Sequence, residues 1–171
     1  REMWAAMAEQ GLLGLGIPED YGGLGGGVTG PVAVMEAMSD AGVPSFVYIL
    51  AAFCTKAILK GGTEDQKLRW VPPVVTGKKR FCFAITEPTA GTNSFNIRTR
   101  AIRTENGYRI TGEKVFTSAA DVADSMMIVA RTNDGPRAEL SLFVVDLPAE
   151  GLTMQRLDVE MYSPDRQFAV Y

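Results

Sequence analysis

The feature that most constrains the fold is a change in the spacing of apolar residues near Gly77. Before this point apolar side chains recur every three to four residues, which is the spacing of helices that pack one face on a core. Beyond it they form short runs separated by turn residues, as strands do. The sequence therefore predicts an α+β chain, with a helical segment over residues 1–78 and a β segment over residues 79–171.

One long apolar helix is expected in the first segment. It follows Pro44-Ser45 and runs to Lys60. Because it is apolar on nearly every side through Phe53, we expect it to be the buried helix of this segment. Its longest apolar run, Phe46 to Cys54, is about half of the roughly 20 residues that cross a bilayer, so no membrane span is expected.

The helix that follows carries the signals of its two ends. Thr63-Glu64-Asp65-Gln66 fits a capping box, in which the Thr63 hydroxyl accepts from the Gln66 amide while the Gln66 side chain reaches back. We expect this helix to end at Pro72-Pro73, because proline cannot continue the hydrogen-bond ladder.

Short strands are expected throughout the second segment. Residues 98–104 and 108–116 flank Glu105-Asn106-Gly107, a turn in which Asn and Gly tolerate positive φ, and together they predict a hairpin. Met126 to Ala130 and Leu140 to Val145 are continuous apolar runs of strand length. We expect both to be covered on their two faces.

The composition excludes several classes of function. The chain has no histidine, which rules out Ser-His-Asp and Cys-His catalysis and histidine zinc sites. Cys54 and Cys82 are too far apart for a Cys-x-x-Cys unit, so no metal site is expected. The formal charge is −3, which argues against nucleic-acid binding. Any difficult chemistry would therefore rely on a bound cofactor or on groups outside these residues.

The glycine-rich loop from Gly14 to Gly27 does not fit a nucleotide-binding motif. A dinucleotide fingerprint needs a strand before its glycines and a helix that opens on them. Here a short helix precedes the loop, and Ile17-Pro18 stands where the third glycine is needed. Turn geometry alone accounts for this loop.

Two stretches of the second segment carry the polar groups of a candidate site. In Phe83 to Thr92 a strand ends in a turn at Pro88, and the hydroxyls of Thr86 and Thr92 flank that turn. In Gly112 to Ser118 a strand delivers an aromatic ring and two more hydroxyls. Each stretch alone is typical of ordinary turn chemistry. Together they suit a flat aromatic ligand with a polar edge, such as a flavin ring.

With these motifs in view, the sequence resembles the acyl-CoA dehydrogenase family of flavoproteins along essentially its whole length. Phe83 to Asn93 is similar to the family signature AxTEPxAGSD, and this is the most specific match. Four further stretches match in order: Gly16 to Gly23, Gly61 to Gly77, Gly112 to Ser118 and Asp124 to Thr132.

The resemblance implies a fold and a reaction. The fold has an N-terminal helical domain, a middle domain like an antiparallel β-barrel or sandwich, and a C-terminal four-helix domain that we expect to be missing here. The reaction is α,β-dehydrogenation of an acyl-CoA thioester with hydride transfer to FAD. The implied partners are the acyl-CoA substrate, an electron-transfer flavoprotein as acceptor, and further copies of the chain in a tetramer or dimer. A bacterial cytoplasm is expected, or the mitochondrial matrix in a eukaryote.

The resemblance also assigns the candidate site residues by position. It implies that Phe83, Ala84, Ile85 and Thr86 line the flavin, with the Thr86 hydroxyl on the ring edge. Thr92 would meet an FAD phosphate or the pantetheine of CoA, Phe116 would lie against the ring, and Thr117 and Ser118 would bond near its reactive edge. No catalytic residue is assigned, because the family's catalytic glutamate belongs to the C-terminal domain and the position of Glu87 is used structurally.

Two other functions remain open on the sequence. The same flavin scaffold serves oxidases and monooxygenases in relatives of this family. A non-catalytic subunit of a heteromeric acyl-CoA dehydrogenase is the other alternative. For the dehydrogenase itself, we expect this segment alone to be inactive and to bind FAD weakly or not at all, because the resemblance implies that much of the cofactor site comes from the absent helices and a neighbouring subunit.

Overall fold

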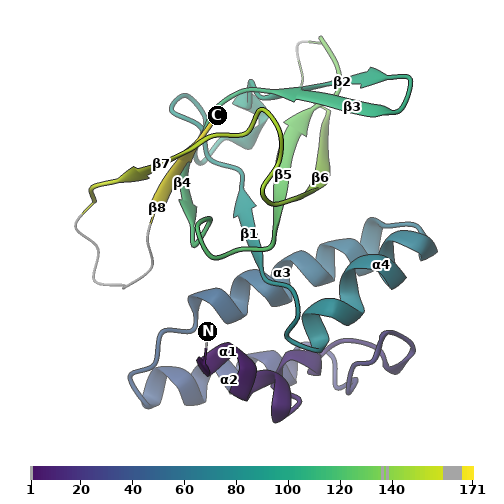
Figure 1. Cartoon of the computed structure of the whole chain (residues 1–171), viewed down its shortest axis with the longest axis vertical. Coiled ribbons are helices and arrows are strands. Elements are labelled where there is room, and N and C mark those ends of the chain that lie inside the picture. Colours follow the sequence, from purple (N-terminus) through teal and green to yellow (C-terminus); the bar gives the residue numbers. More distant parts are fainter. Residues whose placement is uncertain (1, 136, 138, 160–166) are drawn as a thin grey trace. The chain divides into compact units, whose positions relative to one another are not determined.

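A computed structural model describes residues 2–135, 137, 139–159 and 167–171 of the chain. The chain divides into two compact units, residues 1–81 and residues 82–171. Helices make up the first unit and strands dominate the second (Figure 1). The predicted α+β class is thereby confirmed.

Four α-helices and two short 3₁₀ turns build the helical unit. Trp4 in the first helix anchors the end of this unit, because its indole N–H donates a 3.0 Å hydrogen bond to the carbonyl oxygen of Gly77. The helices are α1 (Glu2–Glu9), α2 (Thr29–Asp40), α3 (Phe46–Gly61) and α4 (Glu64–Val75), and the turns are η1 (Leu12–Gly14) and η2 (Glu19–Tyr21).

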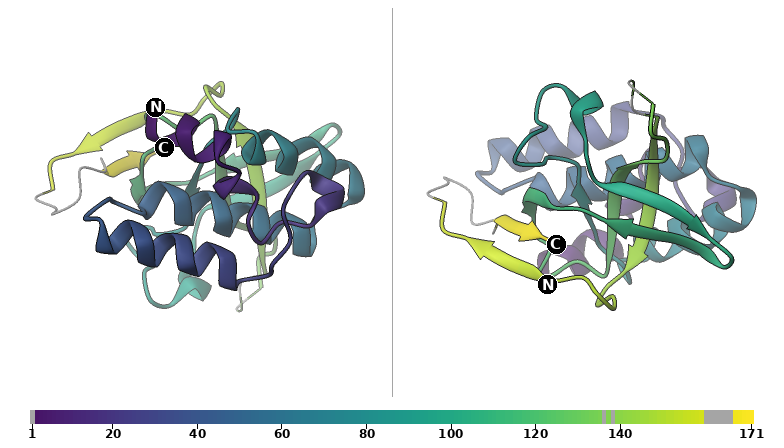
Figure 2. Two further views of the ribbon diagram at one scale, coloured as in Figure 1. Left: turned by 90° about the horizontal axis from the view of Figure 1, so that it is seen from below. Right: turned by 90° about the horizontal axis from the view of Figure 1, so that it is seen from above.

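Helix α3 is buried along one side only. Tyr48, Cys54 and Ile58 are buried, whereas Ile49 and Phe53 are 42% and 50% exposed. The helix has the most buried residues of its segment, as expected, but its apolar surface is covered on one side only. Its neighbours α2 and α4 contact only part of its surface, and Figure 2 shows α2 and α3 lying side by side. Ile49 and Phe53 line an apolar pocket of about 250 Å³ between α2, α3 and the glycine-rich loop.

Helix α4 begins as predicted and ends later than predicted. The backbone amide of Thr63 donates to the Gln66 side chain at 2.9 Å, and the amide of Gln66 donates to the Thr63 hydroxyl at 3.3 Å. The predicted capping box is thus confirmed. Pro72 and Pro73 lie inside the helix. A proline lacks the amide donor, but its carbonyl oxygen can still accept a hydrogen bond from the next turn. The amide of Thr76 donates to the carbonyl oxygen of Pro72 at 3.0 Å.

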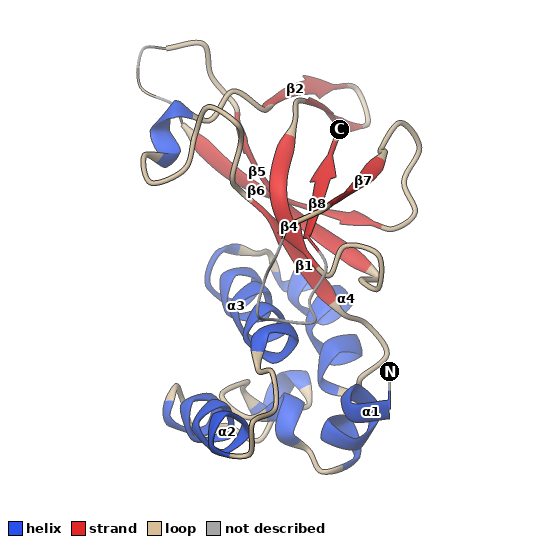
Figure 3. Cartoon of the chain, turned by 90° about the vertical axis from the view of Figure 1, so that its left-hand side faces the viewer, coloured by secondary structure: helices blue, strands red, loops and turns tan. Residues whose placement is uncertain are grey.

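Two sheets form the β unit, and Figure 3 shows them as the red strands. The first has the strand order β1-β5-β2-β3, with β6 also paired to β5, and the second has the order β4-β8-β7. Strands β2 and β5 pair in parallel at Arg100 and Arg131, which departs from a purely antiparallel domain. The strands are β1 (Phe81–Ala84), β2 (Arg100–Thr104), β3 (Gly107–Thr111), β4 (Lys114–Ser118), β5 (Ser125–Arg131), β6 (Leu140–Asp146), β7 (Met154–Leu157) and β8 (Gln167–Val170).

The predicted hairpin is present, but its second strand is shorter than expected. Thr104 pairs with Gly107 across a two-residue turn. The chain then leaves the sheet at Gly112, and β4 joins the other sheet. The backbone at Gly112 passes against Thr99 so closely that a side chain at this position would collide with it. One expected strand over residues 108–116 is therefore two strands in two sheets.

The main core of the β unit lies between the sheets. Cys82 and Met126 contribute from the first sheet, and Phe168 and Val170 contribute from the second. Strand β5 is buried along residues 125–130, as its apolar run predicted. Strand β6 is only half covered, with Leu142 48% exposed, so the expectation of cover on both its faces is wrong. Across the described residues, no helix combines the length and apolar character needed to cross a membrane.

Candidate functional site

The two candidate stretches meet at the end of strand β1. The backbone amide of Val115 in β4 donates a 2.9 Å hydrogen bond to the carbonyl oxygen of Thr86, just beyond β1. One residue earlier on each strand, the Lys114 ammonium donates to the carbonyl oxygen of Ile85 at 3.0 Å. The fold therefore brings together residues that are 29 positions apart in the sequence.

A buried ion pair reinforces this junction. Lys114 Nζ lies 2.9 Å from Glu87 Oε1, and each side chain is only 3% exposed. The backbone amides of Arg98 and Thr99 donate to the same carboxylate at 2.7 and 2.9 Å. Both carboxylate oxygens are thus occupied, and they close the loop that runs from residue 87 to residue 99.

The electrostatics of the pair follow from burial and hydrogen bonding. Burial alone would raise the pKa of Glu87, but the hydrogen bonds from Lys114 and from the backbone amides of Arg98 and Thr99 outweigh it and hold the pKa below its ordinary value. Burial also lowers the pKa of Lys114, and the ion pair with Glu87 opposes this shift. Glu87 is therefore an ionised carboxylate at neutral pH.

The loop that Glu87 closes carries Thr92, the second candidate hydroxyl of the first motif stretch. Glu87 and Ala90 exchange two backbone hydrogen bonds of 2.9 and 3.1 Å, which make a tight turn around Pro88-Thr89. Thr92 follows this turn and is exposed. Next to it, the Asn93 side chain accepts from the amide of Phe95 at 3.2 Å, so the backbone beyond Thr92 is also fixed.

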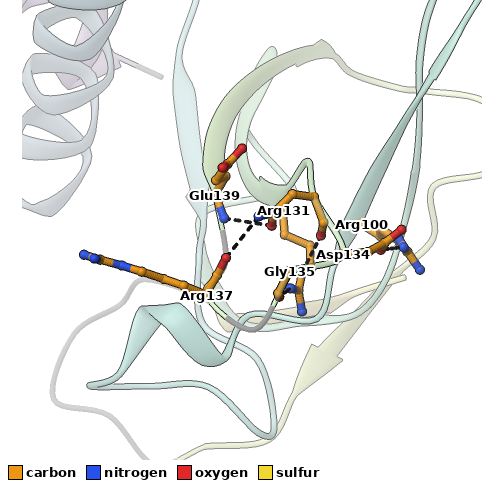
Figure 4. Close-up of polar contacts among 7 residues, drawn as sticks. Arg100, Arg131, Asp134, Gly135, Arg137 and Glu139 are labelled. Carbon is orange, nitrogen blue, oxygen red and sulfur yellow. Dashed lines mark hydrogen bonds and ion pairs between the residues drawn. The ribbon is translucent and has the colours of Figure 1, made fainter.

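A second ordered loop lies beside Phe95. The Arg131 guanidinium donates to the carbonyl oxygens of Asn133 and Gly135 at 3.0 and 2.8 Å (Figure 4). The Asn133 amide in turn donates to the carbonyl oxygen of Arg137 at 3.1 Å. The Arg137 guanidinium carbon lies 5.0 Å from the centre of the Phe95 ring, within cation–π range.

Phe116 adopts a backbone conformation that is rare for an aromatic residue. Its φ is +56°, in the left-handed region, and its side chain is 57% exposed. The register with β8 shifts between Lys114 and Thr117, so Phe116 sits in a β-bulge. Such strain costs free energy and is found most often at functional sites, where it aims a side chain. Here the strained residue carries an exposed ring and directly follows Val115, whose amide is bonded to the Thr86 carbonyl.

Thr117 and Ser118 lie on opposite faces of β4, as successive strand residues must. Thr117 pairs with Phe168, a residue of the core, and is 1% exposed. Ser118 pairs with Gln167 on the other face, and its hydroxyl oxygen accepts a hydrogen bond from the Gln167 amide. The oxygen Oγ1 of Thr117 is buried and has no partner among the described residues.

Comparison with known proteins identifies the family. Residues 1–78 match the model of the acyl-CoA dehydrogenase N-terminal domain, and residues 82–164 match that of the acyl-CoA dehydrogenase middle domain. The chain belongs to the acyl-CoA dehydrogenase family. The resemblance drawn from the sequence motifs is thereby confirmed.

Individual relatives cover the whole chain. Acyl-CoA dehydrogenase FadE12 of Mycobacterium tuberculosis is 39% identical over 99% of this chain and 45% of its own length. The caffeyl-CoA reductase-Etf complex subunit CarC of Acetobacterium woodii is 33% identical over 94% of this chain and 43% of its own length. A chain in the crystal structure of the ChsE4-ChsE5 complex from Mycobacterium tuberculosis superposes with a TM-score of 0.88 at 30% identity, over 99% of this chain and 45% of that one. The chain thus spans about 45% of the length of these relatives.

Within this acyl-CoA dehydrogenase chain, the β1 residues of the candidate site use their side chains for packing. Ala84 is fully buried in the main core. Phe83 and Ile85 are half-buried against a second core cluster formed by Ala90, Ile97 and Val129. These three residues therefore leave chiefly backbone groups to face a ligand, and Thr86 is the first to add a half-buried hydroxyl.

Two polar residues of this region were not assigned a role from the sequence. Lys114 lies inside the second motif, but the sequence there shows only a charged residue at the start of a strand. Gln167 is separated from Ser118 by 49 residues, and no local signal links them. In the described part of the chain, no group of three or more His, Cys, Asp or Glu residues could hold a metal ion.

Proposed function

We propose that this chain forms one wall of the FAD site in an acyl-CoA dehydrogenase. The observation that carries the proposal is the hydrogen bond from Val115 to Thr86, which joins the strand of the exposed Phe116 to a turn rich in hydroxyls and backbone groups. A ring held outward by a strained bulge gives a flat ligand a face to stack on. The Thr86 and Ser118 hydroxyls would meet its polar edge.

The donor set fits a neutral aromatic ligand with several acceptor atoms. The two motif stretches offer the backbone groups of residues 83–86 and the hydroxyls of Thr86 and Ser118, whereas Thr117 lies on the core face of β4. On the Ser118 face of this strand pair, Gln167 Oε1 is buried and has no partner among the described residues, so a further hydrogen bond can form there. Thr92, on the adjoining loop, would reach an FAD phosphate or the pantetheine of the substrate.

The proposed reaction is α,β-dehydrogenation of an acyl-CoA thioester, in which bound FAD supplies the hydride acceptor. This chain's residues would orient the ring and exclude water around it. The base that removes the α-proton lies outside these residues. Glu87 cannot serve, because its carboxylate is 3% exposed and already accepts from Lys114 and two backbone amides.

The remaining partners follow from the same proposal. The substrate would be an acyl-CoA thioester. Electron-transfer flavoprotein would accept the electrons, since a 33% identical relative is a subunit of a complex with Etf. We also propose assembly with further copies of the chain, in the bacterial cytoplasm.

A non-catalytic role in a heteromeric acyl-CoA dehydrogenase is the second candidate. It is favoured by the ChsE4-ChsE5 complex, one chain of which superposes on 99% of this one. The two candidates differ in whether the polypeptide turns over by itself.

The test is to purify the polypeptide that carries this chain at its natural length and record its visible spectrum. We expect a stoichiometric flavin spectrum that bleaches when acyl-CoA thioesters are added. A colourless protein that gains no flavin on incubation with FAD overturns the proposal. A flavin spectrum that bleaches only after a second subunit is supplied favours the heteromeric role.

A further inference from the structure

The side-chain amide of Gln167 donates a hydrogen bond to the hydroxyl oxygen of Ser118. The two residues are directly opposite each other in the antiparallel pair of β4 and β8. Gln167 Nε2 donates to Ser118 Oγ at 2.5 Å. Both residues are buried, at 5% and 6% exposure, so water competes little for this hydrogen bond.

The direction of this hydrogen bond decides what Ser118 can offer a ligand. A serine hydroxyl has one donor hydrogen and two acceptor lone pairs. Since one lone pair is taken by the Gln167 amide, the hydrogen is free to point away from Gln167. A serine without such a neighbour rotates among staggered positions and turns its hydrogen in several directions.

The strand geometry singles out Ser118 for this arrangement. Thr117 lies on the opposite face of β4, against the core residue Phe168. The Gln167 oxygen Oε1 is buried without a partner among the described residues, which is a state that folded proteins avoid unless the group serves a purpose. An apolar residue at position 167 would have packed with no such penalty.

We propose that Gln167 is a positioning residue, which fixes the Ser118 hydroxyl as a hydrogen-bond donor toward an acceptor on the edge of the FAD ring. This inference rests on the proposed function. It adds a residue outside both motif stretches and gives its side chain a definite task. Gln167 itself does not touch the ring.

The experiment uses the holoprotein at its natural length, with the dissociation constant and visible spectrum of FAD as readouts. Gln167→Met keeps the length of the side chain and removes its donor. We expect FAD binding about five-fold weaker and a shifted flavin band, as for the loss of one hydrogen bond. Ser118→Ala should give the same change. In the double variant, Gln167→Met should add nothing to the effect of Ser118→Ala.

Two further variants separate positioning from packing. Ser118→Thr keeps the hydroxyl and should behave like the original protein. Ser125→Ala removes another buried serine hydroxyl of the β unit, which donates to Asp146 at 3.1 Å, and should lower the melting temperature without shifting the flavin band. If Gln167→Met fails to fold, Gln167→Glu replaces it as a variant of the same shape that has no donor when ionised, and the same band shift is expected.

Each result has a definite meaning. A shift with Ser118→Ala but none with Gln167→Met or Gln167→Glu overturns the positioning role and leaves the proposed function standing. Equal effects of Gln167→Met with and without Ser118 also overturn it, because the residue would then act through packing. A protein that binds no FAD overturns both the inference and the proposed function.

Discussion

Lys114 Nζ lies 2.9 Å from Glu87 Oε1, and the two side chains are each 3% exposed. This pair connects the first residue of β4 to the turn after β1. The main-chain hydrogen bond from Val115 to Thr86 lies directly beside it. The candidate flavin wall therefore depends on a buried charge pair.

Breaking the pair from one side should destabilise the chain strongly. Lys114→Met leaves the Glu87 carboxylate buried without its countercharge, and we expect a loss of about 3–5 kcal/mol in the free energy of unfolding. The double variant Lys114→Met, Glu87→Gln removes both charges and should recover much of that loss. Urea denaturation measures the free energy of unfolding of the single and the double variant. A double variant no more stable than the single one would show that the pair's charges are not the source of the effect.

Stability should fall in acid because of Glu87. Its pKa in the folded chain lies below the ordinary value of 4.5, so its contribution is complete above pH 4.5 and is lost as the pH falls through the folded value. Glu87→Gln cannot titrate. The stability difference between the original chain and this variant should be constant near pH 7 and shrink below pH 4.5. Two curves that stay parallel down to pH 3 would contradict the assignment.

The backbone strain at Phe116 should lower the free energy of unfolding, while its ring should favour FAD binding. Its φ of +56° costs an L-residue about 1–2 kcal/mol, while glycine adopts it freely. Because the ring is 57% exposed, Phe116→Gly gives up little burial. We expect the free energy of unfolding to stay the same or rise by up to about 1 kcal/mol, allowing for the flexibility of glycine.

Binding by the same variant should weaken in the full-length holoprotein, by about five-fold for FAD if the ring stacks on the flavin. Val115→Gly is the matched comparison, since Val115 is the preceding residue and has a negative φ. That change should destabilise the chain. If Phe116→Gly proves as destabilising as Val115→Gly, the strain assigned to Phe116 is absent.

The capping box of α4 is expected to contribute measurably to the helical unit. Thr63→Ala leaves the amide of Gln66 without its acceptor and should lower the free energy of unfolding by about 1 kcal/mol. Thr63→Ser retains the hydroxyl and should cost far less. Thermal or urea unfolding followed by circular dichroism distinguishes the two. Equal losses in both variants would point to the threonine methyl group instead of the hydrogen bond.

Features that depend on neighbours in the sequence were predictable. The capping box needs only Thr63 and Gln66, and the turn at residues 105–107 needs only residues that tolerate its dihedral angles. The α+β class follows from hydrophobic periodicity, which reports how each segment meets its own core. The two motif stretches could also be picked out, because a strand that ends in a polar turn is a local pattern.

Long-range packing decided the rest. Helix α3 looked apolar on every side, yet only the position of α2 and α4 determines which of its faces is covered. Gly112 ends one strand because Thr99 lies against it, and no local signal announces that approach. Pro72 and Pro73 stay within α4 because the carbonyl of Pro72 still finds a donor at Thr76.

The fold class, the family motifs and the kinds of polar group available for a site can be read from the amino-acid sequence. Which of those groups meet depends on how the chain packs. The register of β4 against β8 assigned Thr117 to the core and Ser118 to Gln167, and burial made Glu87 a structural anion. These outcomes depend on contacts between residues tens of positions apart in the sequence, and such contacts form only when the chain folds.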